Sequence, residues 1–196
     1  DPLAEMASAP AGGMPPQSSS DLNRLTSNWG VTLRIGEILG DAEAALMVGG
    51  ANGSPVRHLG ILGFDAGYLS DEDVVTAPLE TINMSTAGIL DVDEVDGILV
   101  MPLISSSVYA SSLPSIQFQF LSDPAELQKG FSPSGQQYSA AVRLSGAAKS
   151  AFPEGIKGVD KQVVPETKEL QVVLVADTDL LSDRLWVQVQ NFFGQQ

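Results

Sequence analysis

The sequence lacks cysteine altogether and has a single histidine, His58, among its 196 residues. The absence of cysteine excludes disulfides, thiolate metal sites and thiol nucleophiles, but it does not indicate a compartment, since many cytosolic and periplasmic domains also lack cysteine. A serine hydrolase would need His58 as its base, and no GxSxG motif is present to hold a nucleophilic serine. The sequence therefore gives little support to nucleophilic catalysis.

Basic residues are scarce as well. Ten Lys and Arg stand against 24 Asp and Glu, so the formal net charge is −14. Such a chain repels phosphate backbones and anionic lipid headgroups, and it has no basic stripe to offset that repulsion. We therefore expect no nucleic acid among its partners.

Long apolar runs and nucleotide-binding motifs are also missing. No stretch reaches the about 18 consecutive apolar residues that a membrane-spanning helix needs, and neither GxxxxGK[ST] nor a GxGxxG between strand and helix occurs. We expect no ATPase site and no cofactor. Because the chain starts on Asp1-Pro2, we also expect a piece of a longer protein, truncated on the N-terminal side of its domain.

What the chain does contain is enough apolar material for a core, 43% of its residues. Residues 4–20 are the exception, since they are rich in Ala, Pro, Gly and Ser and cannot bury enough surface to offset the entropy of ordering. We predict that residues 1–20 are a linker or disordered loop and that residues 21–196 form a single α/β domain.

Most of the domain reads as short strands separated by Gly, Asn and Asp. A helix is predicted from Asp21 to Trp29, with Gly30 as its stop, and a helical turn from Asp123 to Lys129. Pro102 is expected to end the strand before it, which should be buried on both faces. The predicted strands before the last one are residues 31–39, 44–48, 59–64, 79–90, 97–101, 116–120 and 138–144.

The last unit is the clearest. Leu170–Ala176 predicts a buried strand, and a helix is predicted from Ser182 onward, with Leu185, Val189 and Phe192 on one face. A strand, an acidic turn and a helix in this order favour a mixed or doubly wound sheet.

Asp177 and Asp179 lie in the turn of that unit, where open α/β sheets bind ligands, so we consider them candidate ligands of Mg²⁺ or Ca²⁺. The alternative needs no metal: Asp179 and Asp183 complement the positive helix N-terminus and Asp177 caps the turn.

Ser105, Ser106 and Ser107 follow an apolar run, and their hydroxyl and N–H groups are candidates for binding an anion at a strand end. A plain serine-rich turn is the simpler interpretation, and nothing in the sequence brings His58 to Ser106. The acidic stretches 71–73 and 91–96 are expected to be solvated loops.

Several stretches together resemble the auxiliary component of ABC-type transport systems associated with gliding motility, a family of membrane-anchored proteins with a large extracytoplasmic domain. The stretch around Asp177 is the most distinctive. The matching stretches are Asp1–Glu5, Leu25–Val31, Ala140–Gly146, Lys149–Pro153 and Ala176–Trp186, with weaker agreement at Met101–Leu103.

The resemblance implies an α/β domain similar to the class I glutamine amidotransferase-like (flavodoxin-like) fold. It also implies anchors outside this chain, a periplasmic or extracytoplasmic location at the inner membrane, and partnership with a separate permease and ATPase. Amidotransferase chemistry needs a cysteine nucleophile, which this chain lacks, so the resemblance favours a scaffold without that chemistry.

Three hypotheses follow. The leading one is a non-catalytic accessory domain that contacts the permease or the exported substrate. The second is a divergent hydrolase, either serine-dependent or metal-dependent through Asp177 and Asp179. The third is a structural role in which the domain associates with itself to brace the complex.

Overall fold

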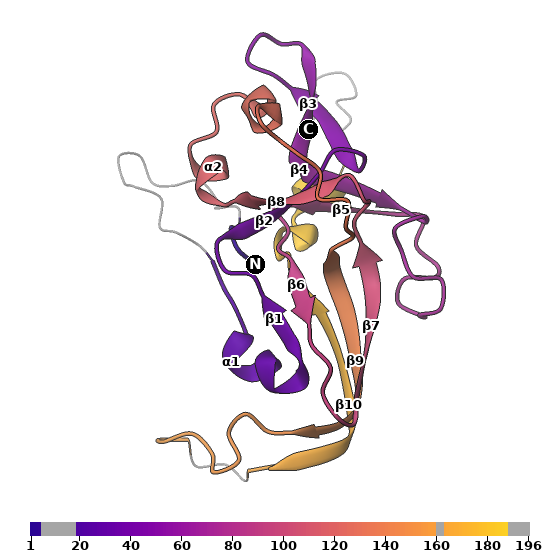
Figure 1. The fold of residues 1–196 in the computed structure, drawn as a ribbon, viewed down its shortest axis with the longest axis vertical. Helices are drawn as coiled ribbons and strands as arrows, with labels where there is room; N and C mark the ends of the chain where they lie inside the picture. The colour runs from indigo at the N-terminus through magenta and orange to yellow at the C-terminus, as the bar shows by residue number, and fades with distance from the viewer. Residues whose placement is uncertain (5–18, 160–162, 188–196) are drawn as a thin grey trace, which may run out of the picture.

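The computed structural model describes residues 1–4, 19–159 and 163–187, and their strands form three antiparallel sheets (Figure 1). The largest sheet has five strands, in the order β1-β6-β9-β10, with β7 paired to the other side of β9. Its strands are β1 (Val31–Leu33), β6 (Leu90–Val92), β7 (Ile98–Ser105), β9 (Ser139–Lys149) and β10 (Glu166–Val175).

Two smaller sheets lie at one end of the five-stranded sheet, the upper end in Figure 1. One pairs β2 with β8, and the other has the order β3-β4-β5. Their strands are β2 (Glu37–Asp41), β8 (Ala110–Pro114), β3 (Ala45–Gly49), β4 (Pro55–Asp65) and β5 (Thr81–Ser85).

The predicted fold class is wrong. Every pairing between the described strands is antiparallel, whereas a doubly wound, amidotransferase-like sheet is built mainly of parallel strands. The described helices have only three to five residues, too short to cover a parallel sheet. β10 pairs instead with β9, the strand before it in the chain, with Val172 opposite Leu144.

Several local predictions are confirmed. The predicted N-terminal helix is present as α1 (Asn23–Thr26) and η1 (Ser27–Trp29), and Gly30 ends it in the left-handed conformation with φ 78°. The turn after Asp123 is η2 (Pro124–Gln128). Near the end of the described chain, η3 (Asp179–Leu181) and α3 (Asp183–Trp186) follow β10, while Val189 and Phe192 lie outside the described residues.

The strand predicted at residues 116–120 is wrong, because this segment contains the helix α2 (Ile116–Gln119). The alternation of apolar and polar residues predicted a strand with one buried face, but two of the three apolar side chains face water. Ile116 and Phe120 are four residues apart, hence on one helical face, and both are exposed. Phe118 alone packs against the core cluster around Leu59 and Leu113.

The prediction that Pro102 ends its strand is also wrong, since β7 continues to Ser105. The pairing with β9 shifts between Pro102 and Ile104, and such irregularities accommodate a residue that cannot donate a backbone hydrogen bond. The strand is not buried on both faces either, because Leu99 is 67% exposed.

Three groups of buried side chains stabilise these sheets. The largest group includes Phe64, Met84 and Ile89 and joins residues of the smaller sheets to residues of β7 and β9. The second is formed mainly by residues of β1, β6, β9 and β10. The third surrounds Leu59. Among the described residues, no helix is long and apolar enough to cross a bilayer.

Residues 5–18, most of the predicted linker, lie outside the described part of the chain. Residues on the two sides of this segment are joined to each other. The amino group of Asp1 donates to the carbonyl of Ser20 at 2.8 Å, and the backbone N–H of Ser20 donates to the carbonyl of Asp1 at 2.9 Å.

Candidate functional site

The turn after β10 places Asp177 against the end of β5. The Asp177 side chain is 3% exposed. Its Oδ2 accepts a hydrogen bond from the Ser85 N–H at 2.8 Å, and its Oδ1 accepts one from the Asp179 N–H at 2.6 Å. The first of these bonds joins residues 92 positions apart. Asp177 therefore links the five-stranded sheet to the β3-β4-β5 sheet.

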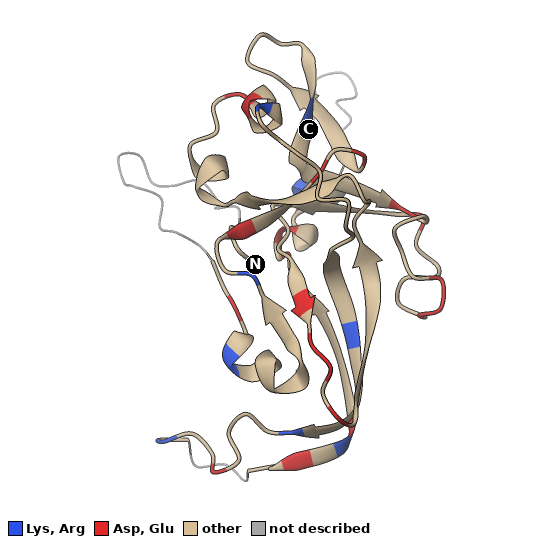
Figure 2. Ribbon diagram, in the orientation of Figure 1, with Lys and Arg blue, Asp and Glu red and all other residues tan. Residues whose placement is uncertain are grey.

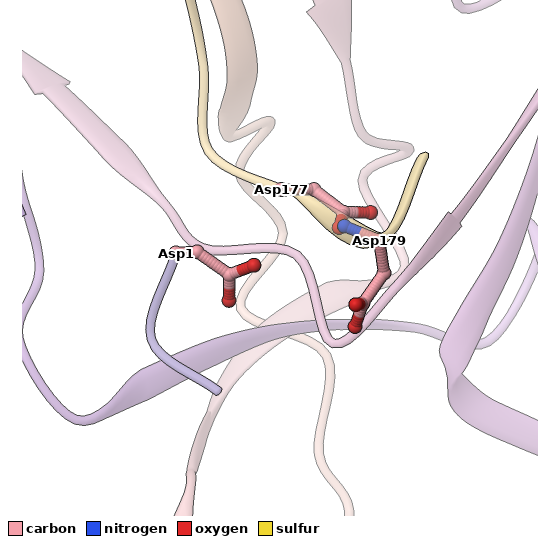
Figure 3. Close-up of side chains that lie close together, drawn as sticks. All are labelled: Asp1, Asp177 and Asp179. Atoms are coloured by element: carbon pink, nitrogen blue, oxygen red, sulfur yellow. The ribbon is translucent and has the colours of Figure 1, made fainter. Parts of the chain in front are cut away.

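Asp1 reaches the same turn from the other end of the chain (Figure 3). Its Oδ2 accepts hydrogen bonds from the N–H of Thr178, at 2.8 Å, and from the Thr178 hydroxyl, while its Oδ1 accepts one from the Leu3 N–H at 2.9 Å. Asp1, Asp177 and Asp179 are all buried, and each offers a carboxylate oxygen within 4.8 Å of the others. Three acidic side chains thus meet in a small volume.

Burial changes the proton affinity of Asp177. Loss of solvent raises its pKa from 3.8 to about 6, and the nearby charge of Asp179 acts in the same direction. Backbone N–H groups of Ser85, Asp179 and Leu180 oppose this rise by stabilising the charged form, and burial is the larger effect. The Asp177 carboxylate consequently gains or loses its proton in a mildly acidic range.

Three carboxylate oxygens are the kind of donor that Mg²⁺ or Ca²⁺ prefers. Here, however, the carboxylates of Asp1 and Asp177 already accept the backbone N–H groups described above. These contacts give the cluster a structural role in joining chain segments. The metal-binding role of Asp177 and Asp179 stays a prediction.

A small cavity adjoins the cluster. It has a volume of about 140 Å³, with Asp1 and Thr178 on its wall together with Leu33, Leu90 and Leu174. Apolar side chains contribute much of this wall, and the space is of the order of a few water molecules. Asp21, which lies outside the cluster, adds one further acidic residue to the wall.

The three candidate serines do not converge on one open space. Ser106 and Ser107 are buried, and Ser105 is half-buried. The Ser107 N–H and hydroxyl donate to the two carboxylate oxygens of Asp41, at 2.7 and 2.8 Å. The Ser106 hydroxyl donates to the Ser107 carbonyl at 2.9 Å and accepts from the Tyr138 N–H at 2.8 Å. Anion binding here stays a prediction.

His58 is buried on β4 and is held by local contacts. Its Nδ1 accepts the N–H of Gly60 at 3.2 Å, and its ring lies 6.0 Å from that of Phe118. Burial lowers the pKa of His58, which favours the neutral ring. Because Nδ1 accepts a hydrogen bond, the proton of the neutral ring lies on Nε2. Among the described residues, no hydrogen bond joins His58 to Ser106.

Among the described residues, sequence reasoning missed three buried acids, which are Asp1, described above, and Asp41 and Asp73. Asp41 is fully buried and accepts the N–H groups of Glu43 and Ala44 in addition to Ser107. Asp73 was expected in a solvated loop, but it is buried and receives two hydrogen bonds from Arg143, one of them at 2.8 Å. Arg143 lies 70 positions away, so no local pattern could reveal the pair.

Several of the stretches that carried the resemblance to a transport family are in contact. The Ala176 N–H, for example, donates to the Ala140 carbonyl at 2.9 Å, and Met101 lies opposite Arg143. Asp1 binds Thr178 of the Ala176–Trp186 stretch, as described above. The indole Nε1 of Trp29 donates to the carbonyl of Lys149 at 3.0 Å, which joins two further stretches.

Comparison with curated proteins and with solved structures found no match. A family model matches residues 1–196. The model describes auxiliary proteins of an ABC-type uncharacterized transport system. Because this match covers the whole sequence, the chain belongs to that family and is an auxiliary component of an ABC-type transport system.

Proposed function

We propose that this chain is a non-catalytic, extracytoplasmic accessory domain that contacts the permease or the exported substrate of its transport system. The observation that carries the proposal is the family match over residues 1–196. The proposal includes a position at the periplasmic face of the inner membrane, anchors elsewhere in the parent protein, and an association with gliding motility. The net charge of −14 supports a protein partner over an anionic membrane surface.

The hydrogen bonds that the candidate side chains make support a non-catalytic role. Ser107 is bound to Asp41, and Asp177 binds the backbone of Ser85. His58 accepts a backbone N–H on one ring nitrogen. In the part of the chain that the structure describes, these residues make structural hydrogen bonds and do not form a nucleophile–base pair.

The central experiment is a mild-detergent pull-down of the full-length parent protein from its own membranes, followed by mass spectrometry. Recovery of an ATPase and a permease subunit supports the accessory role. A parent protein that repeatedly purifies without either subunit would contradict it.

The location can be tested because the chain has no cysteine of its own. Ser54 lies in the exposed turn between β3 and β4, so we expect Ser54→Cys to react with a membrane-impermeant maleimide in intact cells. The parent protein used would carry no other accessible cysteine. Labelling only after the inner membrane is permeabilised would place the domain in the cytoplasm and refute the proposal.

A metal-dependent hydrolase is the alternative, and the proximity of Asp1, Asp177 and Asp179 is the observation that favours it. Calorimetric titration with Mg²⁺ and with Ca²⁺ tests it. Binding that is lost in the double variant Asp177→Asn, Asp179→Asn would support this alternative, and an absence of binding heat in the unaltered protein would refute it.

A further inference from the structure

The loop between β4 and β5 shows an inverted burial pattern in residues 71–80. Its polar residues Asp73 and Thr76 are buried, with exposed fractions of 4% and 3%. Its apolar residues Val74, Val75 and Leu79 are 84%, 46% and 37% exposed. Loops ordinarily bury apolar side chains and expose polar ones, and a group of exposed apolar side chains marks an interaction site.

Hydrogen bonds hold this loop in shape. Asp73 receives two hydrogen bonds from Arg143 of β9, and its carboxylate also accepts the Val75 N–H at 2.9 Å. The Asp73 carbonyl accepts the Thr76 N–H at 3.1 Å, and the Thr76 hydroxyl donates to the Ser70 carbonyl at 2.7 Å. The valines are thus presented on an ordered turn, which reduces the entropy lost when a partner binds.

The loop adjoins an apolar sheet face. Arg143 lies directly opposite Met101 of β7 on one side and Val173 of β10 on the other, so the three side chains share one face. Leu99, two positions from Met101, points to the same side and is 67% exposed. We call the 71–80 loop together with Leu99, Met101 and Val173 the loop–sheet surface.

The exposed charged residues of the loop are all acidic. Asp71, Glu72 and Glu80 are exposed beside the apolar side chains, and Figure 2 shows acidic residues on the loop between β4 and β5. The sequence has no Lys or Arg between Arg57 and Lys129, and Arg143 is paired with Asp73. Anionic lipid headgroups would be repelled here, whereas a basic protein surface would be attracted.

We propose that the loop–sheet surface is the docking site for the permease subunit of the transport system, through a permease surface with an apolar pocket rimmed by Lys and Arg. Val74 and Val75 occupy the pocket, and Asp71, Glu72 and Glu80 face the basic rim. This inference rests on the proposed function, because it assigns that accessory role to one surface and one partner.

The first test uses the double variant Val74→Asp, Val75→Asp in the full-length parent protein. Buried carboxylates without partners oppose docking, so we expect at least about a tenfold loss of co-purified permease. Ile35→Asp is the matched control, since Ile35 is 74% exposed in the turn between β1 and β2, outside this surface. We expect that control to recover permease at the unaltered level.

The outcomes separate the two proposals. If the unaltered protein recovers the permease and the valine variant does so equally, the docking site is wrong while the accessory function stands. If the unaltered protein recovers the ATPase without the permease, only the docking site fails, and if it recovers neither subunit, both proposals fail. Thermal unfolding of the valine variant and of the Ile35 control would show whether both are folded. If the aspartates unfold the domain, the double variant Val74→Ser, Val75→Ser replaces them with uncharged polar residues.

The second test identifies the partner directly. A photoreactive phenylalanine analogue at position 74 should form a crosslink to the permease in native membranes, to a peptide that contains Lys or Arg. Glu72→Lys should reduce the yield several-fold, and so should added salt, because both weaken the attraction between acidic and basic surfaces. Crosslinks to lipid alone, or to a second copy of this chain, would overturn the proposal.

Discussion

At the scale of single residues, the acidic side chains have very different environments. Asp177 is desolvated, which raises its pKa to about 6, whereas the two hydrogen bonds from Arg143 hold the pKa of Asp73 at about 2. Asp41 is fully buried and is bound by N–H and hydroxyl donors. All three residues look alike in sequence, and only their partners in the fold distinguish them.

The raised pKa of Asp177 predicts a dependence of stability on pH. Since the folded pKa of about 6 exceeds the unfolded value of 3.8, protonation favours the folded state. The resulting stabilisation is complete below the unfolded pKa and is lost as the pH rises through the folded pKa.

Compared with Asp177→Asn, the unaltered protein should therefore lose up to about 3 kcal/mol in free energy of unfolding between about pH 4 and about pH 7. Urea unfolding of both proteins across this range measures the effect. A difference that does not vary with pH would contradict the prediction.

Asp41→Ala should be strongly destabilising. The change leaves the N–H groups of Glu43, Ala44 and Ser107 without their acceptor in a buried place, and we expect a loss of about 4 kcal/mol in the free energy of unfolding. Ser107→Ala removes one hydroxyl, which donates to Asp41 and accepts the Tyr109 N–H, and should lose about 2 kcal/mol. Urea unfolding compares the two, and equal losses would show that Asp41 does not act as the common acceptor.

At the scale of elements, short glycine-punctuated runs were enough to predict most strands. The strand predicted at residues 138–144 overlaps β9, and that at 170–176 overlaps β10. The latter is not a buried strand as predicted, because Val173 and Val175 are exposed. Prediction failed at α2, because an exposed helix turn and a half-buried strand can show the same alternation over five residues. It also failed for strand direction, since apolar pattern reports burial and not the identity of the neighbouring strand.

Gly146→Ala should distort the β7–β9 pairing. Gly146 has φ 118°, and a Cβ atom there would lie 2.2 Å from the carbonyl oxygen of Gly97. Because that contact is with backbone, relief requires a shift of a strand, and we expect a loss of about 3 kcal/mol in the free energy of unfolding.

Gly49→Ala is the matched control, since a Cβ atom at Gly49 meets nothing within 4 Å and its φ is not in the left-handed region. Chemical denaturation should show a change of less than about 1 kcal/mol for the control. Equal stability of the two variants would contradict the backbone contact at Gly146.

Arg143→Ala should loosen the loop between β4 and β5. Without Arg143 the buried Asp73 carboxylate has no cationic partner, so its pKa should rise from its value of about 2. We expect faster hydrogen exchange at the amides of Val75, Thr76 and Ala77, with little change in β3. Arg57→Ala, on β4 of the β3-β4-β5 sheet, is the control. Unchanged exchange in the loop of Arg143→Ala would contradict this anchoring role.

At the scale of the whole molecule, Asp177 and Arg143 join parts that are distant in sequence. Asp177 joins the five-stranded sheet to β5, and Arg143 joins it to the loop after β4. Asp1 connects the start of the chain to Thr178. These links favour the prediction that residues 21–196 form one domain.

A single domain should unfold in one step. The two tryptophans report on different regions, because Trp29 contacts Lys149 at the end of β9 and Trp186 lies in α3 beyond β10. Variants with only one tryptophan, Trp29→Phe and Trp186→Phe, should each give one urea transition by fluorescence. Within each variant, that midpoint should coincide with the midpoint from circular dichroism. Midpoints that differ between the two probes would indicate two units.

The sequence alone determined those properties that depend on composition and on near neighbours. The lack of cysteine excluded thiol chemistry, the excess of acid set the charge, and Gly30 marked the end of the first helix. The resemblance identified an auxiliary family of ABC-type transport systems, which the match over residues 1–196 confirmed, while the association with gliding motility stays a prediction.

Only the tertiary structure decided the sheet pairing, the burial of Asp41 and Asp73, and the meeting of Asp1 with Thr178. The burial of Asp41 and Asp73 and the meeting of Asp1 with Thr178 depend on contacts between residues 66 to 177 positions apart. The local pattern around an aspartate is the same whether a distant arginine or water binds it. Its solvation and its pKa are therefore fixed only when the chain folds.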